Sequence, residues 1–237
     1  MCVSVAMASY NGEAYIGEQL ESILSQLDEG DEVVVSDDGS SDKTPEIVAA
    51  IAEQDPRVKW IEGPRKGLIY NFENALKHCS GEYIFLSDQD DIWRPGKVAA
   101  VVDALKEKAT LVLHDAQMVD DEKHVLNASF FAWRGTTTGY WANIKKNSYI
   151  GCCMAFRRSL LEWALPFPEK LPMHDQWLGL LAEKTGTVYL ENQVFLDYRR
   201  HEGTATTDHH SSVLKMISYR VNIIRALHER LAKKEGK

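Results

Sequence analysis

The chain has 237 residues, of which 44% are hydrophobic and 26% charged, a composition typical of a globular domain and not of a disordered or fibrous protein. Its 27 Lys and Arg residues and 35 Asp and Glu residues give a formal net charge of −8, which argues against a nucleic-acid-binding protein because such proteins concentrate basic charge. The length suits one α/β domain.

Short β-rich runs alternate with segments of helical periodicity in the first half of the sequence. Strands are expected at residues 3–8, 32–36, 58–62, 83–87 and 111–114. Helices are expected between them, at residues 15–26, 45–54, 70–79 and 95–106. Strands that alternate with helices predict an open, mostly parallel sheet that carries helices on both of its faces.

The second half of the sequence is less regular, and residues 116–149 have the pattern of strands and loops. The expected elements after them are a buried strand at 151–156, helices at 159–164 and 174–184, strands at 188–190 and 194–198, a loop at 199–210 and a helix from about 211 to 234. Because no linker, repeat or low-complexity segment interrupts the chain, we expect one domain.

Cysteine usage and the start of the chain both predict a cytoplasmic protein. The four cysteines lack the spacing of metal ligands, so buried free thiols in a reducing compartment are expected for Cys2, Cys79, Cys152 and Cys153. The sequence begins directly with a strand-like run and has no charged leader. No apolar run approaches the about 18 residues of a membrane-spanning helix.

Carboxylates follow two of the predicted strands, at the edge of the sheet where ligands bind in this architecture. Asp88 and Asp90 come directly after the strand at 83–87, two residues apart, so both side chains point to the same side in extended geometry. Such a pair suits Mg²⁺ or Mn²⁺ and leaves positions open for phosphate oxygens. An ordinary solvated loop or a helix cap would have the same composition.

The second acidic turn, at residues 37–42, follows the strand at 32–36. Its Asp, Gly and Ser residues are favoured in turns, and Ser41 or Asp42 would suit the cap of the next helix. Alternatively, the carboxylate of Asp38 accepts a hydrogen bond from the imide N–H of a uracil or thymine base. The turn alone does not distinguish these interpretations.

Several motifs together resemble one family. The sequence contains, in order, VAMASYNG at 5–12, VSDDGSSD at 35–42, FLSDQDDIW at 85–93, GCCMAF at 151–156, MHDQW at 173–177 and YRRH at 198–201. This combination covers about residues 3–205 and resembles the glycosyltransferase family 2 enzymes, which are inverting sugar transferases with the GT-A fold. The SDQDDIW motif, with Asn71-Phe72-Glu73 upstream, is similar to rhamnosyltransferases of surface polysaccharide assembly.

The resemblance implies a GT-A domain at residues 1–210, with a nucleotide-sugar-binding half at 1–115 and an acceptor-binding half at 116–210. Residues 211–237 hold seven basic and two acidic side chains and are expected to form a basic amphipathic helix. Apolar residues recur there at helical spacing, at Leu214, Ile217, Val221, Ile224 and Leu231. Such a helix suits packing on the domain, a homodimer contact or the cytoplasmic membrane surface.

The metal site implied by the resemblance consists of Asp90 as a direct ligand, Asp88 near the ribose or the metal-bound waters, and His201 near the metal or the diphosphate. Mn²⁺ or Mg²⁺ is the implied cofactor, because a divalent cation neutralises the departing nucleoside diphosphate. For His201, an exposed loop position is the alternative.

The donor-binding positions implied by the resemblance are Ser9 and Asn11 on the first loop, Asp38, which would contact the nucleobase, and Asp88. Lys66 would reach a phosphate in this interpretation, whereas a lysine in a turn is otherwise simply solvated. These residues all come from the first 115 residues of the chain.

The general base implied by the resemblance is Asp175, at the start of the predicted helix 174–184, where it would deprotonate the acceptor hydroxyl. A carboxylate that merely caps the helix would occupy the same position. Trp177, Asp91 and Trp93 are the expected acceptor-binding residues, although aromatic residues near a helix start also pack in cores.

The function expected from the resemblance is metal-dependent, inverting sugar transfer by direct displacement. The donor is dTDP-rhamnose, or next a UDP-hexose, and the acceptor is a glycan or lipid-linked glycan. The sequence lacks the G-x-G-x-x-G, P-loop and G-x-S-x-G motifs of dinucleotide enzymes, NTPases and serine hydrolases. The alternatives are a nucleotidyltransferase that makes sugar nucleotides, and a non-catalytic sugar-nucleotide-binding protein.

Overall fold

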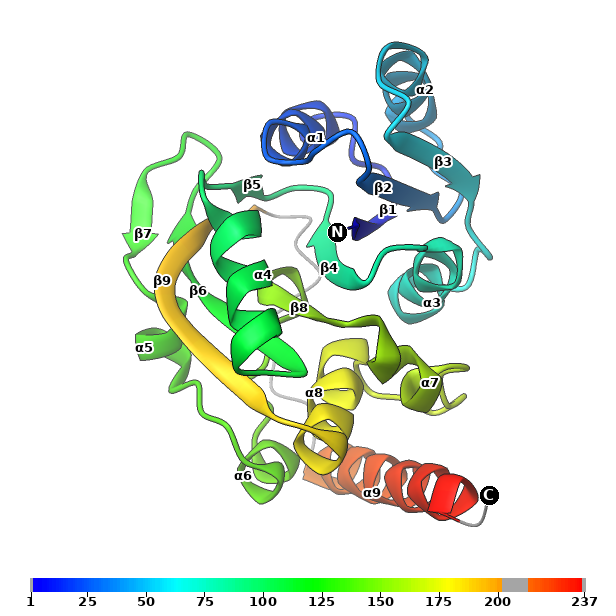
Figure 1. Ribbon diagram of the computed structural model, residues 1–237, viewed down its shortest axis with the longest axis vertical. Helices are drawn as coiled ribbons and strands as arrows, with labels where there is room; N and C mark the ends of the chain where they lie inside the picture. The colour runs from blue at the N-terminus through cyan, green and yellow to red at the C-terminus, as the bar shows by residue number, and fades with distance from the viewer. Residues whose placement is uncertain (1, 202–212, 236–237) are drawn as a thin grey trace.

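The computed structural model describes residues 2–201 and 213–235 of the chain. One sheet runs through the molecule with the strand order β3-β2-β1-β4-β8-β6-β9-β5, and β7 pairs with β6. Helices flank this sheet, and the C-terminal helix lies at one end of the molecule (Figure 1). The predicted α/β architecture is therefore confirmed.

The first part of the sheet is parallel. Its strands are β1 (Val3–Ser9), β2 (Glu32–Asp37), β3 (Val58–Glu62) and β4 (Tyr83–Asp88). The connecting helices are α1 (Ile16–Leu24), α2 (Thr44–Gln54) and α3 (Leu68–His78). All residues of β1 and β2 are buried, as expected for parallel strands covered on both faces. Each of these elements begins and ends within two residues of its predicted bounds.

The second part of the sheet mixes strand directions. β8 (Met154–Arg157) runs antiparallel to both β4 and β6 (Leu111–Val119), whereas β9 (Val188–Arg199) runs parallel to β6. Two short antiparallel strands complete the sheet, β5 (Ile92–Trp93) beside β9 and β7 (Val125–Asn127) beside β6.

The helices of the second part are α4 (Lys97–Glu107), α5 (Phe130–Arg134), α6 (Tyr140–Lys145), α7 (Leu161–Ala164), α8 (His174–Thr185) and α9 (Val213–Glu235). Turns of 3₁₀ helix lie at Gly151–Cys153 and Arg158–Leu160. In Figure 1, α4 crosses β6 and β9, while α7, α8 and α9 gather at the end of the molecule away from α2.

Three predictions for the second half are wrong in part. Residues 116–149 contain the helices α5 and α6, which are too short to show helical periodicity. The ends of α5 are marked instead by caps: the Ser129 hydroxyl accepts a hydrogen bond from the Ala132 N–H, and Gly135 follows the helix with φ +71°. The strands expected at 188–190 and 194–198 form the single strand β9, because a shift in its register with β6 accommodates the polar residues between them. The expected strand at 151–156 begins as a 3₁₀ turn.

The C-terminal helix packs on the domain only in part through the apolar stripe predicted for it, since Leu231 of that stripe packs against the core. Ile223 and Leu227 are buried, whereas Ile217, Val221 and Ile224 are 37–57% exposed. No helix among the described residues is long and apolar enough to cross a membrane. Residues 202–210 of the loop predicted at 199–210 lie outside the described residues. The same holds for residues 211 and 212 of the helix predicted at 211–234, and for the side chain of Leu214.

Candidate active site

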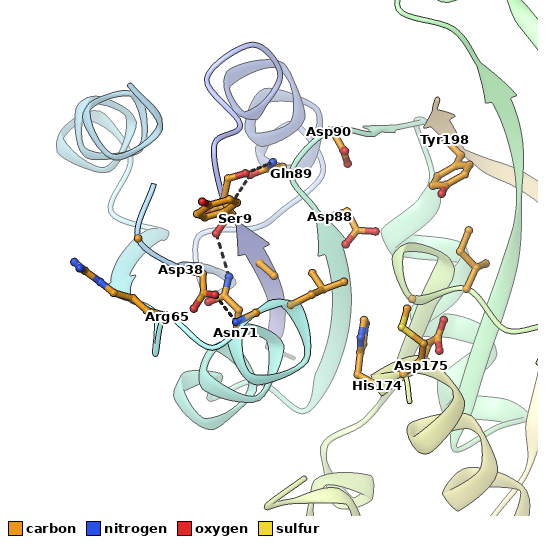
Figure 2. Close-up of a pocket in the computed structure, with 18 residues that line it drawn as sticks. Ser9, Asp38, Arg65, Asn71, Asp88, Gln89, Asp90, His174, Asp175 and Tyr198 are labelled. Carbon is orange, nitrogen blue, oxygen red and sulfur yellow. Dashed lines mark hydrogen bonds between the residues drawn. The ribbon is translucent and has the colours of Figure 1, made fainter. Parts of the chain in front are cut away.

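A cavity of about 620 Å³ opens at the carboxyl ends of the parallel strands. The register of the sheet explains its position, because Ser9 pairs with Asp37 across β1 and β2 while Ala8 pairs with Asp88 across β1 and β4. Figure 2 shows Asp38 toward one side of the cavity, Asp175 toward the other and Asp88 between them.

The turn after β2 is built around a buried carboxylate. Asp37 accepts hydrogen bonds from the Ser9 hydroxyl at 3.0 Å, the Ser40 hydroxyl at 2.6 Å and the Ser40 N–H at 2.8 Å. Gly39, at φ +90°, completes the turn in a conformation that suits glycine. Asp37 therefore shapes the turn that presents the next carboxylate, Asp38, to the cavity.

Asp38 lines the cavity and organises the turn after β3. Its carboxylate accepts from the N–H groups of Lys66 at 3.2 Å and Gly67 at 2.7 Å. The cation that lines the cavity beside Asp38 is Arg65. Sequence reasoning named Lys66, its neighbour, because spacing alone does not show which of two adjacent basic side chains faces a ligand.

Of the two residues predicted on the first loop, Ser9 lines the cavity and Asn11 supports the loop. The Asn11 side-chain oxygen accepts a hydrogen bond from the Ser41 N–H at 2.9 Å, and the main-chain N–H of Asn11 donates one to the Ser40 hydroxyl at 2.8 Å. Asn71 of α3 also lines the cavity and donates to the carbonyls of Ser9 and Ser36, at 3.1 and 2.8 Å. The loop is thus fixed from two sides.

Asp88 and Asp90 both line the cavity at the end of β4, as predicted, and Figure 2 shows them near each other. Burial, with repulsion from Asp90 and Asp175, raises the pKa of Asp88 to about 7. The His201 imidazole lies with its Nε2 2.9 Å from Asp90 Oδ2 and stacks on Tyr15 with ring centroids 4.7 Å apart. Asp88 and Asp90 offer the carboxylate oxygens that Mn²⁺ and Mg²⁺ prefer, a cation between them would relieve their repulsion, and the His201 imidazole lies beside Asp90.

A buried arginine holds the loop that carries these carboxylates. The Arg199 guanidinium donates to the Asp90 carbonyl at 2.9 Å and to the Glu18 carboxylate at 2.8 Å, and the Arg199 N–H donates to Asp91 Oδ1 at 3.1 Å. Asp91 is 1% exposed, and its carboxylate oxygen lies within 4.8 Å of ligand atoms of Asp88 and Cys152. Asp91 therefore lies in the interior of the loop that carries Asp88 and Asp90, and its acceptor-binding role stays a prediction.

Asp175 lies at the start of α8 and lines the cavity. Burial raises its pKa to about 6, although the carboxylate accepts hydrogen bonds from the Gln176 N–H and, at 3.3 Å, from the Asn147 amide. A carboxyl group that ionises near neutral pH at the wall of a cavity suits a general base.

His174 precedes Asp175 and is the second titratable group on this wall. Its ring stacks on Phe72 with centroids 4.1 Å apart, and burial lowers its pKa to about 3. Neither ring nitrogen has a hydrogen-bond partner among the described residues. Its imidazole is therefore neutral at physiological pH. Sequence reasoning did not single it out because nothing in the sequence distinguishes it from a core histidine.

The two tryptophans predicted to bind the acceptor are core residues. Trp177 is fully buried, and its indole N–H donates to the Ala164 carbonyl at 3.0 Å. Trp93 is 3% exposed and packs against Phe85, with the Lys97 ammonium 3.8 Å from its ring centroid. Neither side chain offers a face on which a sugar could stack.

Several carboxylates gather around one cavity at the edge of the parallel strands, which is where ligands bind in open α/β sheets. Residues 4–163 match the family model described as "Glycosyl transferase family 2". Because this match covers more than half of the chain, the protein belongs to glycosyltransferase family 2.

Curated relatives agree with this assignment. The chain is 31% identical over 185 residues to the UDP-Glc:alpha-D-GlcNAc-diphosphoundecaprenol beta-1,3-glucosyltransferase WfgD of Escherichia coli, covering 76% of this chain and 70% of that protein. It is 25% identical over 173 residues to the uncharacterised glycosyltransferase alr2836 of Nostoc, covering 70% of this chain but only 54% of that protein. The chain thus spans about half the length of the latter relative.

Solved structures show the same fold. S. aureus TarS 1–349 in complex with UDP-GlcNAc has a TM-score of 0.69 at 21% identity, with 98% of this chain and 72% of that chain covered. The mannosyltransferase PcManGT of Pyrobaculum calidifontis, in complex with GDP-Man and Mn²⁺, has a TM-score of 0.64 at 21% identity, with 97% and 73% covered.

Proposed function

We propose that this protein is an inverting, metal-dependent glycosyltransferase that uses a UDP- or dTDP-linked sugar donor. The observation that carries the proposal is that a single cavity is lined by Asp38, by Asp88 and Asp90, and by Asp175. These side chains correspond to the three functions that such a reaction needs: recognition of the base, neutralisation of the diphosphate and activation of the acceptor.

Asp90, Asp88 and His201 would hold the divalent cation, which supplies Lewis-acid stabilisation of the departing diphosphate when bound. Asp175 accepts the proton of the acceptor hydroxyl as its oxygen attacks the anomeric carbon. The bond from that carbon to the diphosphate oxygen breaks in the same step, and the nucleoside diphosphate leaves with the bonding electron pair. Direct displacement inverts the anomeric configuration.

A pyrimidine base is proposed because uracil and thymine carry the same imide N–H, which would donate a hydrogen bond to the Asp38 carboxylate. The name of the E. coli relative supports a UDP-hexose donor. The SDQDDIW motif favours dTDP-rhamnose. The two donors therefore form the first pair to compare.

The acceptor is proposed to be a glycan, and a lipid-linked one is favoured because the E. coli relative is named for a diphosphoundecaprenol acceptor. The exposed face of α9 is proposed to meet the membrane surface, since Ile217, Val221 and Ile224 lie beside the exposed Arg225. Binding to vesicles that contain anionic lipid, lost in Val221→Asp, would test this contact.

The test of the function is nucleoside diphosphate release from UDP-glucose, UDP-galactose, UDP-N-acetylglucosamine, dTDP-rhamnose and GDP-mannose. Each donor is supplied with glycan and lipid-linked acceptors, with Mn²⁺, with Mg²⁺ and with EDTA. Metal-dependent release from a UDP or dTDP donor, abolished in Asp175→Asn, is expected. Asp103→Asn, on an exposed carboxylate of α4, is the control. Equal rates in Asp175→Asn and wild type, or pyrophosphate release from a nucleoside triphosphate with a sugar phosphate, would contradict the proposal.

A further inference from the structure

The side chain between the two metal-site aspartates binds the backbone of a different loop. Gln89 Oε1 accepts a hydrogen bond from the Tyr10 N–H at 2.8 Å, and Gln89 Nε2 donates one to the Tyr10 carbonyl at 2.9 Å. One carboxamide therefore satisfies both main-chain groups of Tyr10, as an adjacent β-strand would. Figure 2 shows Gln89 above Ser9, beside the start of the first loop.

Gly12 provides the space for this contact. A Cβ atom at Gly12 would lie 2.4 Å from both Cδ and Oε1 of Gln89, and its three nearest neighbours would all be atoms of this side chain. Because real Cβ atoms do not approach other atoms so closely, any side chain at Gly12 displaces the Gln89 carboxamide. The backbone at Gly12 does not itself require glycine, since its φ is not positive.

The residue held by this contact faces the ligand cavity. Tyr10 and Asp38 line the same cavity, and Tyr10 is 57% exposed, so its side chain is accessible there. The next residue in the loop, Asn11, is fixed from the other side by Ser40 and Ser41. Neighbouring residues of the loop are thus held by other partners, whereas Gln89 binds the main chain of Tyr10 itself.

We propose that Gln89 is a positioning residue for nucleotide binding: it holds the Tyr10 backbone so that the Tyr10 ring forms one wall of the nucleoside site. This inference rests on the proposed function, in which Asp38 marks the base end of the cavity. Gln89 thereby fixes the loop after β1, here the nucleotide loop, to the loop after β4, here the metal loop. In this proposal, the carboxylates on either side of Gln89 bind the metal.

The first test is the Gln89→Ala variant, assayed by calorimetric titration with UDP, and with dTDP as a second probe. Loss of both anchoring hydrogen bonds is expected to weaken nucleotide binding and raise the donor KM about tenfold, with kcat within about twofold. Mn²⁺ binding, measured separately by electron paramagnetic resonance, should stay within about twofold. An equal loss of Mn²⁺ affinity would refute the proposal, because it would mean that the metal loop itself had collapsed.

The second test uses the steric relation between the two positions. Gly12→Ala should weaken UDP binding about as much as Gln89→Ala, because it pushes the carboxamide away. In the Gln89→Ala background the same Gly12→Ala change should have little further effect, since the atoms that it would strike are gone. Gly17→Ala is the matched control, because its Cβ would meet only Ile47 Cγ2, at 3.9 Å.

A double-mutant cycle with Tyr10→Ala tests whether Gln89 acts through the tyrosine. If it does, Gln89→Ala costs about tenfold in UDP affinity when Tyr10 is present and less than about twofold when it is absent. Additive losses in this cycle, or in the cycle with Gly12→Ala, would refute the proposal. A wild-type protein that binds neither UDP nor dTDP would instead refute the proposed function, and the inference with it.

Discussion

The hydrogen bond from the Asn147 amide to the Asp175 carboxylate offers a direct test of the general base. The amide nitrogen lies 3.3 Å from Asp175 Oδ1. Burial raises the pKa of Asp175 to about 6, and the hydrogen bonds from the Gln176 N–H and from Asn147 limit that rise because they favour the ionised form. Asn147→Ala removes one of these donors, so the pKa of Asp175 should rise further.

The size of the effect follows from the geometry. A well-formed hydrogen bond to a charged group contributes ~1.5–3 kcal/mol, and one at the long end of the range contributes less. Since ~1.4 kcal/mol corresponds to a pKa change of one, we expect Asn147→Ala to raise the pKa of Asp175 by roughly 0.5 to 1. Only the ionised base accepts a proton, so kcat/KM should fall about two- to fivefold at pH 6 and stay close to wild type at pH 8.5.

The assay is kcat/KM for nucleoside diphosphate release between pH 5 and pH 9, at constant ionic strength and saturating metal. Thr138→Ala, on an exposed side chain of the segment that precedes Asn147, is the control. A wild-type profile without an acid limb near pH 6 would contradict the assignment of Asp175. So would an Asn147→Ala profile that loses activity equally at every pH, because the limb would then not report this carboxyl group.

Three further predictions concern stability. Asp175→Asn should inactivate the enzyme yet raise its free energy of unfolding at pH 7.5 by ~1–3 kcal/mol, because an amide avoids the cost of burying an ionised group whose pKa is raised to about 6. In urea titrations this gain should shrink as the pH falls from about 6 to about 4, and it should be absent at lower pH, where the carboxyl is protonated in both states. Glu32→Gln should be destabilising instead: burial alone would raise the pKa of Glu32, but hydrogen bonds from Lys59 and two serines outweigh it and lower the pKa to about 2. The expected loss is ~1–2 kcal/mol at pH 7, reduced because Lys59 is half exposed, and it should vanish as the pH falls through about 2. Trp177→Phe should cost ~1–2 kcal/mol of stability, because the buried Ala164 carbonyl loses its donor, and should leave the acceptor KM within about twofold. A raised acceptor KM at unchanged stability would instead support the acceptor-binding role predicted for Trp177.

The parallel half of the fold could be predicted because its pattern is local. β4 begins with the apolar run Tyr-Ile-Phe-Leu, and α1 repeats Ile16, Leu20 and Ile23 at helical spacing. Once the strands are parallel, their carboxyl ends share one edge. The positions of Asp38 and Asp88 at a common cavity therefore follow from sequence order alone.

Side-chain direction could not be predicted in the same way. Trp93 and Trp177 follow motif residues closely, yet both turn into the core, because the sequence does not show which face of a two-residue strand or of a helix start is covered. Similarly, Arg65 and Lys66 are neighbours with the same charge, and only the backbone of the turn decides that Arg65 lines the cavity.

Contacts between distant segments of the chain could not be predicted from the sequence either. Gln89 and Tyr10 are 79 positions apart, and Arg199 reaches Asp90 across 109 positions. Neither contact involves a hydrophobic pattern or a charge pair that the sequence would reveal, because in both cases a side chain binds a main-chain group. Main-chain groups are the same at every position, so such partners become visible only in three dimensions.

The position of Gln89 follows from the topology of the sheet. The order β3-β2-β1-β4 reverses direction at β1, and in such sheets the ligand crevice lies at this reversal, beside the loops after β1 and β4. Helix α1, which follows the loop after β1, also contacts the segment after β4: Gln19 donates to the Asp88 carbonyl at 3.2 Å, and the Ser22 hydroxyl accepts from the Trp93 N–H at 3.0 Å. The two loops themselves meet at Gln89. The Gln89 carboxamide joins them at that point, with both of its polar atoms on the Tyr10 backbone. Under the proposed function, a nucleotide on one loop must be aligned with a cation on the other, and an error in the spacing of the loops would separate the diphosphate from that cation.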